Sequence, residues 1–189
     1  MAAKTTKRLI EVLLVRGEMT GVPERGLLKS RNLGAVDMIW PRASIAKKSS
    51  AREFVFKKGK IDFTAEPWAK RVLFREEVEG HTAFAVSITE PVSIQKVRRF
   101  LRLSAKYALK QGADFVEKAM LGFGDLASAP VDALAAMVGE NDAPKIIAQG
   151  VVDLMELPAE GEEVLVTVPL FRPKLLKGQT GTLTLAVRG

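Results

Sequence analysis

The chain has 189 residues, a formal net charge of +7, a single histidine and no cysteine. The lack of cysteine excludes disulfides and thiolate chemistry, and one histidine excludes metal sites built from several histidines. The length predicts one domain, and 47% hydrophobic with 27% charged residues is typical of soluble globular proteins. We expect no secretory signal and no membrane span, because no apolar run approaches roughly 20 residues.

The first ninety residues predict a series of short β-strands. Residues 9–15 are apolar except for Glu11 and are rich in residues that favour strands, which predicts a strand buried on much of both faces. A long loop is expected over 17–32 because this stretch is rich in turn residues. Phe84, Val86 and Ile88 alternate with smaller residues, which is typical of a half-buried strand. The remaining strands of this half are predicted at 35–40, at 53–56, at 61–63 and from Pro67 onward.

The pattern changes to helical spacing after Pro91. Residues 93–110 predict a helix with six basic side chains and no acidic one, with Ser93 as its N-cap. A shorter helix is predicted at 130–138, so that residues 92–142 form a helical insertion. Strand character returns at 145–154, 164–170 and 182–187. About eight strands that follow one another without intervening helices predict an antiparallel sandwich.

Several segments resemble successive segments of a C2 domain. Residues 64–74 are similar to the family's Asn-Pro-x-Trp segment, with Glu66 where Asn is usual, and residues 181–187 resemble its closing Gly-x-Leu-x-Leu pattern. Further similar segments lie at 36–40, 84–90 and 145–157. The resemblance implies a mainly β, C2-like antiparallel sandwich over residues 1–189, with the helical insertion at 92–142 inside it.

The resemblance does not extend to the calcium site of that family. Calcium needs about six to eight oxygen ligands, and of the family's ligand positions only Asp37 and Glu90 keep a carboxylate. Val92 stands where the second Asp of a pair is usual, and Pro91 intervenes. We therefore expect no metal and no other cofactor, and any membrane contact is expected to be independent of calcium.

The basic helix is the first candidate interaction surface. A basic amphipathic helix can lie on an anionic membrane, where each Lys or Arg contributes about 1 kcal/mol. Two alternatives stay open: a solvated basic face above a packed apolar stripe, and contact with a partner protein. The candidate residues for an anionic surface are Lys96, Arg99, Arg102, Lys106 and Lys110. The candidate residues for a partner helix face are Val97, Leu101 and Leu109.

A second basic cluster is formed by Lys57, Lys58 and Lys60, in or beside a tight turn. In some C2 domains a lysine-rich cluster on a strand binds phosphoinositide head groups, and the resemblance implies a similar use here. The alternative is that these lysines serve solubility alone.

No arrangement of residues predicts catalysis. His81 is expected in a surface turn, and the glycines around Phe123 lack the spacing of a phosphate-binding loop. Nucleic-acid binding is not expected either, since aromatic residues make up only 6% and no known recognition motif is present. Trp40 and Trp68 are expected to anchor the core.

We therefore expect a non-enzymatic binding or scaffold module. It is expected in the cytoplasm, in part at the periphery of a membrane, and in contact with protein partners, itself or anionic lipid without calcium. The first alternative is a structural subunit of a larger assembly that oligomerises through the insertion helices. The second is an enzyme whose site the sequence does not reveal.

Overall fold

The computed structural model of the protein describes residues 7–21, 29–40, 46–80, 82–89, 146–172 and 179–189. The predicted insertion at 92–142 lies outside these residues. With it lie all candidate residues of the basic helix and of its partner face. His81 and Glu90 are also outside the described residues.

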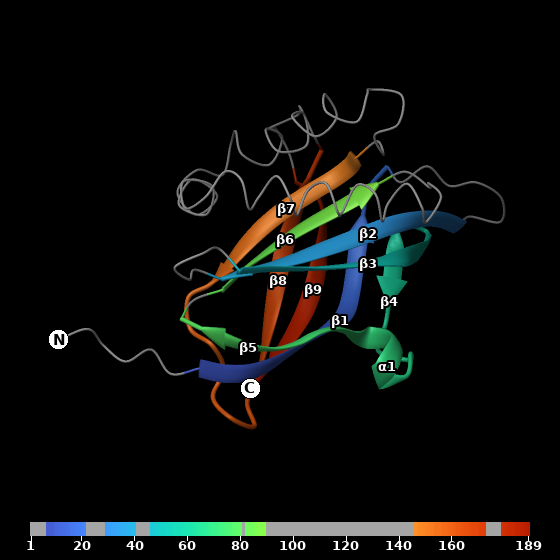
Figure 1. Ribbon diagram of the computed structural model, residues 1–189. Helices are drawn as coiled ribbons and strands as arrows, with labels where there is room; N and C mark the ends of the chain where they lie inside the picture. The colour runs from blue at the N-terminus through green and yellow to red at the C-terminus, as the bar shows by residue number, and fades with distance from the viewer. Residues whose placement is uncertain (1–6, 22–28, 41–45, 81, 90–145, 173–178) are drawn as a thin grey trace.

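The described residues form nine strands and one short helix (Figure 1). In chain order they are β1 (Lys7–Met19), β2 (Lys29–Trp40), β3 (Ala46–Lys57), β4 (Lys60–Asp62), α1 (Trp68–Arg71), β5 (Val72–Glu79), β6 (Thr82–Thr89), β7 (Ile146–Leu154), β8 (Glu163–Phe171) and β9 (Gln179–Arg188). All strand pairs among them are antiparallel. The prediction of a mainly β chain built from successive antiparallel strands is confirmed.

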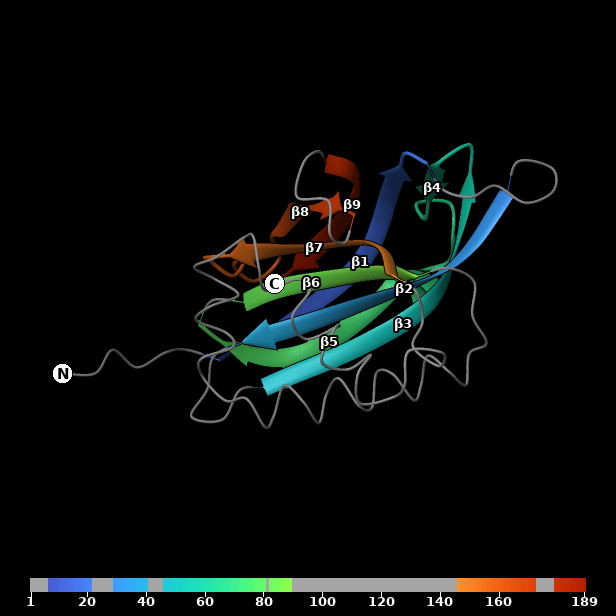
Figure 2. The same cartoon turned by 90° about the horizontal axis from the view of Figure 1, so that it is seen from above.

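The strands join into one sheet in the order β4-β3-β2-β6-β7-β8-β9-β1-β5. Because β4 also pairs with β1, the sheet closes into a barrel, and β5 is an added strand on β1. Two of the strand pairings are limited to one pair of residues. β7 pairs with β8 only at Gln149 and Phe171, and β3 pairs with β4 only at Lys57 and Lys60. Figures 1 and 2 show β3, β2, β6 and β7 side by side, with β1 crossing them at an angle.

Every second residue of a strand points into the barrel, and these inward residues are mostly apolar, so the interior is apolar. Phe84, Val86 and Ile88 of β6 are all buried, which confirms the alternation predicted for this strand. The ring of Phe54 lies edge-on to two neighbours, with centroids 5.4 Å from Phe63 and 6.3 Å from Phe56. These side chains give the described strands one shared core.

Three predictions for the first half of the chain are wrong. β1 extends to Met19 and β2 begins at Lys29, so strands occupy part of the loop predicted over 17–32. The strand predicted from Pro67 begins instead as the single helical turn α1, because Pro67 has the fixed φ (−55°) that precedes a turn and good helix formers follow it. Trp68 is 50% exposed and is therefore no core anchor, whereas Trp40, at 4%, is buried as expected.

Candidate binding surface

The predicted lysine cluster forms the tip of the β3–β4 hairpin. Lys57 pairs with Lys60, and the two residues between them have positive φ, 50° at Lys58 and 73° at Gly59. Positive φ at both central positions is the type I′ geometry that suits the twist of paired strands. The backbone N–H of Met19 donates to the Gly59 carbonyl over 2.8 Å, which fixes the tip to β1. All three lysines are exposed, and none forms an ion pair with another described residue.

Two rows of polar side chains run from this hairpin across the outer face of the neighbouring strands. The first row consists of Asp62, Arg16, Thr184 and Thr167. The second row consists of Lys60, Glu18 and Thr182. Opposite charges therefore face each other at two neighbouring positions, Arg16 with Asp62 and Glu18 with Lys60, an arrangement that favours this pairing of β1 with β4.

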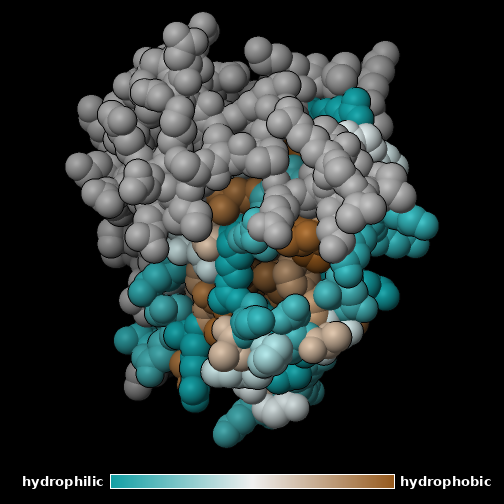
Figure 3. Space-filling model, turned by 90° about the vertical axis from the view of Figure 1, so that its right-hand side faces the viewer, coloured by the Kyte–Doolittle hydropathy of each residue, from teal (hydrophilic) through white to brown (hydrophobic). Residues whose placement is uncertain are grey.

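These rows line an open groove of about 1250 Å³, together with side chains from β3 and from the α1 segment. Figure 3 shows this side of the molecule, where hydrophobic surface lies between hydrophilic residues. The basic residues of the lining are Arg16, Arg52, Lys57, Lys60 and Lys70, and the acidic ones are Glu18, Glu53, Asp62 and Glu66. Five basic and four acidic residues nearly cancel. Two of the five basic residues, Lys57 and Lys60, belong to the hairpin tip, and the rest of the lining has three basic and four acidic residues. The excess of positive charge therefore lies at the hairpin tip.

Asp62 is held in its charged form by its neighbours. Its carboxylate accepts hydrogen bonds from the hydroxyl of Thr64 over 2.7 Å and from the backbone N–H of Thr64 over 2.8 Å. These bonds, and attraction to Arg16 and Arg71, hold the pKa of Asp62 below its ordinary value of 3.8. Because Asp62 stays charged, it offsets the charge of Arg16. Among the tip lysines only Lys60 has an acidic residue opposite it in the register, Glu18, and none of the three forms an ion pair with a described residue.

Side chains connect β3 to β5, which are not hydrogen-bonded to each other as strands. The guanidinium of Arg52 donates to the carbonyl oxygens of Lys70 and Val72, and its partial burial lowers its pKa below the ordinary arginine value. Lys48 forms an ion pair of 3.1 Å with Glu76. These contacts fix the α1 segment on one side of the groove.

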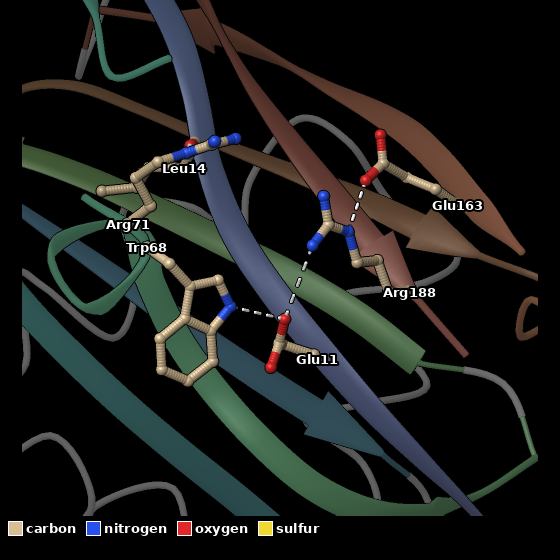
Figure 4. A network of polar contacts seen from close by, with 6 residues as sticks. All are labelled: Glu11, Leu14, Trp68, Arg71, Glu163 and Arg188. Carbon is tan, nitrogen blue, oxygen red and sulfur yellow. Dashed lines mark hydrogen bonds and ion pairs between the residues drawn. The ribbon is translucent and has the colours of Figure 1, made fainter. Parts of the chain in front are cut away.

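A second polar network holds α1 to the outer face of β1 (Figure 4). Trp68 Nε1 donates to Glu11 Oε2 over 3.0 Å, and Nη1 of Arg188 lies 3.9 Å from the same oxygen. Arg188 Nε in turn donates to Glu163 Oε2 over 2.5 Å. Sequence patterns do not predict this network, because its members come from four segments that are far apart in the chain and that no local pattern connects.

Within the described parts of the chain, no three or more His, Asp or Glu side chains gather as a metal site. Asp37, one of the two carboxylates that remain at the calcium-ligand positions of C2 domains, lies within β2 and accepts a hydrogen bond of 2.5 Å from the Ser49 hydroxyl. It therefore links two paired strands. The same parts of the chain contain no helix long and apolar enough to cross a membrane.

No protein-family model and no curated protein matches the chain. One solved structure with a similar chain trace comes from work on CC2D1B in the mitotic reformation of the nuclear envelope. It has 14% sequence identity and a TM-score of 0.42. The match covers 100% of this chain and 57% of that chain, so this chain spans little more than half of that one's length.

Proposed function

We propose that the protein is a non-enzymatic binding module that contacts an anionic surface, without calcium, through the tip of the β3–β4 hairpin. The observation that carries this proposal is the gathering of Lys57, Lys58 and Lys60 at one fixed turn, exposed and without an ion-pair partner among the described residues. Each lysine near an anionic membrane contributes about 1 kcal/mol, and three contribute on the order of 3 kcal/mol. That supports reversible, salt-sensitive association and not permanent anchoring.

The predicted basic helix would add to this surface. Its candidate residues are Lys96, Arg99, Arg102, Lys106 and Lys110. Only the sequence supports a role for these residues, because they lie outside the described part of the chain. Two basic clusters on one chain would bind an anionic vesicle more tightly than one, and added salt would weaken both contacts. The proposed location is the cytoplasm, at the periphery of an anionic membrane.

The proposed architecture is a C2-like sandwich, with β3-β2-β6-β7 as one layer and β8-β9-β1-β5 as the other. The two places where strand pairing is limited to a few residues support this division into layers. β7 and β8 share a single paired position, and β4, which closes the ring, has only three residues. The β3–β4 hairpin lies where β4 closes the ring, and its three lysines are exposed there.

Co-sedimentation with vesicles tests the proposed contact. We expect binding to phosphatidylserine-containing vesicles, no binding to phosphatidylcholine vesicles, and no difference between calcium and EDTA. Lys60→Glu should weaken binding, and Lys57→Glu with Lys60→Glu should weaken it further. Lys7→Glu reverses one exposed lysine at the start of β1 and is the matched control. Absence of wild-type binding to anionic vesicles would refute the membrane contact, as would equal binding by Lys60→Glu and wild type.

A structural subunit of a larger assembly is the second candidate function. It is favoured by the alanine-rich composition of the insertion and by its apolar residues at helical spacing. This candidate predicts a mass in solution above 20.6 kDa that falls when Leu101 or Leu109 is changed to a charged residue. A mass of 20.6 kDa at every protein concentration would exclude it.

A further inference from the structure

One side of β8 is not covered by any described strand along most of its length. Its pairing with β9 extends from Glu163 to Phe171, whereas its pairing with β7 is confined to Phe171 opposite Gln149. Figure 1 shows the two strands diverging from each other. The side of residues 163–168 that faces away from β9 is therefore a sheet edge within the part of the chain that the structure describes.

The direction of the backbone groups along this edge follows from Pro169. Proline has no N–H, so it is tolerated in a sheet where that position faces away from the hydrogen-bonded neighbour. The carbonyl oxygen of Pro169 faces β7, because a Cβ placed on Gly150 would collide with it. Every second residue of a strand directs its N–H and C=O to the same side. Leu165 and Thr167 therefore direct theirs to the open edge.

The edge lacks the features that usually prevent exposed strands from pairing. Residues 163–168 contain no Lys, Arg or Pro, and most are β-branched. Leu165 is 57% exposed and Val164 is 38% exposed. By contrast β5, the strand at the end of the sheet order, exposes Arg75 and Glu77, which are the charges that protect an edge.

We infer that this edge of β8 pairs with the same edge of a second copy of the chain. The two strands would run antiparallel about a two-fold axis at Leu165, which is the self-complementary arrangement that a symmetric dimer requires. In that register Glu163 of each copy lies opposite Thr167 of the other, and no like charges meet. The charge of Glu163 is already paired with Arg188 in its own chain, over 2.5 Å.

The surroundings of β8 fit this arrangement in charge and in space. Glu160 and Glu162 precede the strand and Arg172 follows it, all exposed, so antiparallel pairing brings the acidic end of one copy near the basic end of the other. The chain before β8 turns towards β9, since the N–H of Gly161 donates to the Gly189 carbonyl over 3.1 Å and the N–H of Gly189 donates to the Glu162 carbonyl over 3.0 Å. Residues 161 and 162 therefore bond on the β9 side of the strand and not on the side away from β9.

Single cysteines test this register directly, because the chain has no cysteine of its own. Leu165→Cys would place two thiols opposite each other across the axis, with Cα atoms about 5.5 Å apart, which a disulfide can bridge. Leu9→Cys is the matched control, since Leu9 is 49% exposed and lies on β1, which β9 separates from β8 in the sheet order. Mild oxidation should give mostly covalent dimer with Leu165→Cys and little with Leu9→Cys. Equal yields would overturn the inference.

Sedimentation equilibrium of the unlabelled protein tests the same pairing without a covalent bond. The wild type should approach twice its 20.6 kDa mass as its concentration rises, and Leu165→Lys should stay near 20.6 kDa. Leu9→Lys should behave as wild type, and circular dichroism should show that both variants are folded. A wild type that is monomeric at every concentration would overturn the inference. So would a dimer that persists in Leu165→Lys, because the contact would then lie elsewhere. Neither result bears on vesicle binding by the lysine tip, which is a separate proposal.

Discussion

Trp68 donates its indole N–H to the carboxylate of Glu11 over 3.0 Å, although half of the Trp68 side chain is exposed. The bond joins α1 to the outer face of β1, on the side of the sheet opposite the shared core. Glu11 also lies 3.9 Å from Arg188 of β9. An aromatic residue that sequence patterns assign to the core thus acts as a clamp outside it.

Replacing this tryptophan should weaken the clamp and change the fluorescence of the protein. Trp68→Phe keeps an aromatic ring but removes the donor to a charged acceptor, and should lower the free energy of unfolding by about 1 kcal/mol after allowance for exposure. Iodide should quench wild-type emission and should barely quench Trp68→Phe, because Trp40 is only 4% exposed. Trp40→Phe is the control and should stay quenchable. Equal quenching of wild type and Trp68→Phe would show that Trp68 is not at the surface.

The alternation of apolar residues predicted most strands correctly, because each strand directs every second side chain into one interior. It did not predict the ends of β1 and β2. Gly17, a turn signal in the sequence, lies inside β1, where a Cβ would lie 3.1 Å from Leu183 and 3.2 Å from Ile61. The role of Gly17 depends on packing against strands distant in sequence, and local composition does not predict such packing.

In the candidate site too, residues close together in sequence could be predicted, and residues that meet only after folding could not. The cluster of Lys57, Lys58 and Lys60 could be predicted because the three lysines lie within four consecutive residues around a glycine. The row that joins Arg16 to Asp62 and Thr184 could not be predicted, because its members meet only after three distant strands pair. The predictions for the basic helix stay predictions, because residues 92–142 lie outside the described part of the chain.

A change at the hairpin turn should separate charge from stability. Lys58 has a φ of 50°, in the left-handed region that asparagine adopts more readily than lysine. Lys58→Asn should therefore raise the free energy of unfolding by up to about 1 kcal/mol, as measured by urea denaturation. It also removes one positive charge, so binding to anionic vesicles should fall. Effects of opposite sign cannot come from unfolding. Weaker binding together with lower stability would contradict this account.

Gly34 leaves room for the ring of Phe54. A Cβ placed on Gly34 would overlap that ring, and Phe54 is fully buried. Gly34→Ala should destabilise the protein by about 1–3 kcal/mol, the usual cost of overpacking a core. Phe54→Leu removes part of the ring, so the double variant should be less destabilised than the sum of the two single variants. Urea denaturation of the four proteins measures this coupling, and strictly additive effects would show that the two residues do not compete for space.

The hydroxyl of Thr64 should control the titration of Asp62. It is the largest cause of the lowered pKa of Asp62, ahead of the backbone N–H of Thr64 and the charges of Arg16 and Arg71. A carboxyl group whose pKa is lowered on folding stabilises the protein above its unfolded pKa, near 3.8, and this contribution is lost as the pH falls through the folded pKa. Thr64→Val should therefore be less stable than wild type at neutral pH, and that part of the difference should vanish in acid.

Carboxyl-carbon NMR of Asp62 measures the shift itself. In Thr64→Val the pKa of Asp62 should rise towards 3.8 but stay below it, because the backbone bond and both arginines remain. Thr64→Ser keeps the hydroxyl and should titrate as wild type does. If Thr64→Val also titrates as wild type does, the backbone N–H of Thr64 and the two arginines hold the carboxylate and the hydroxyl does not. In that case Arg16→Gln, and not Thr64→Val, would raise the pKa of Asp62.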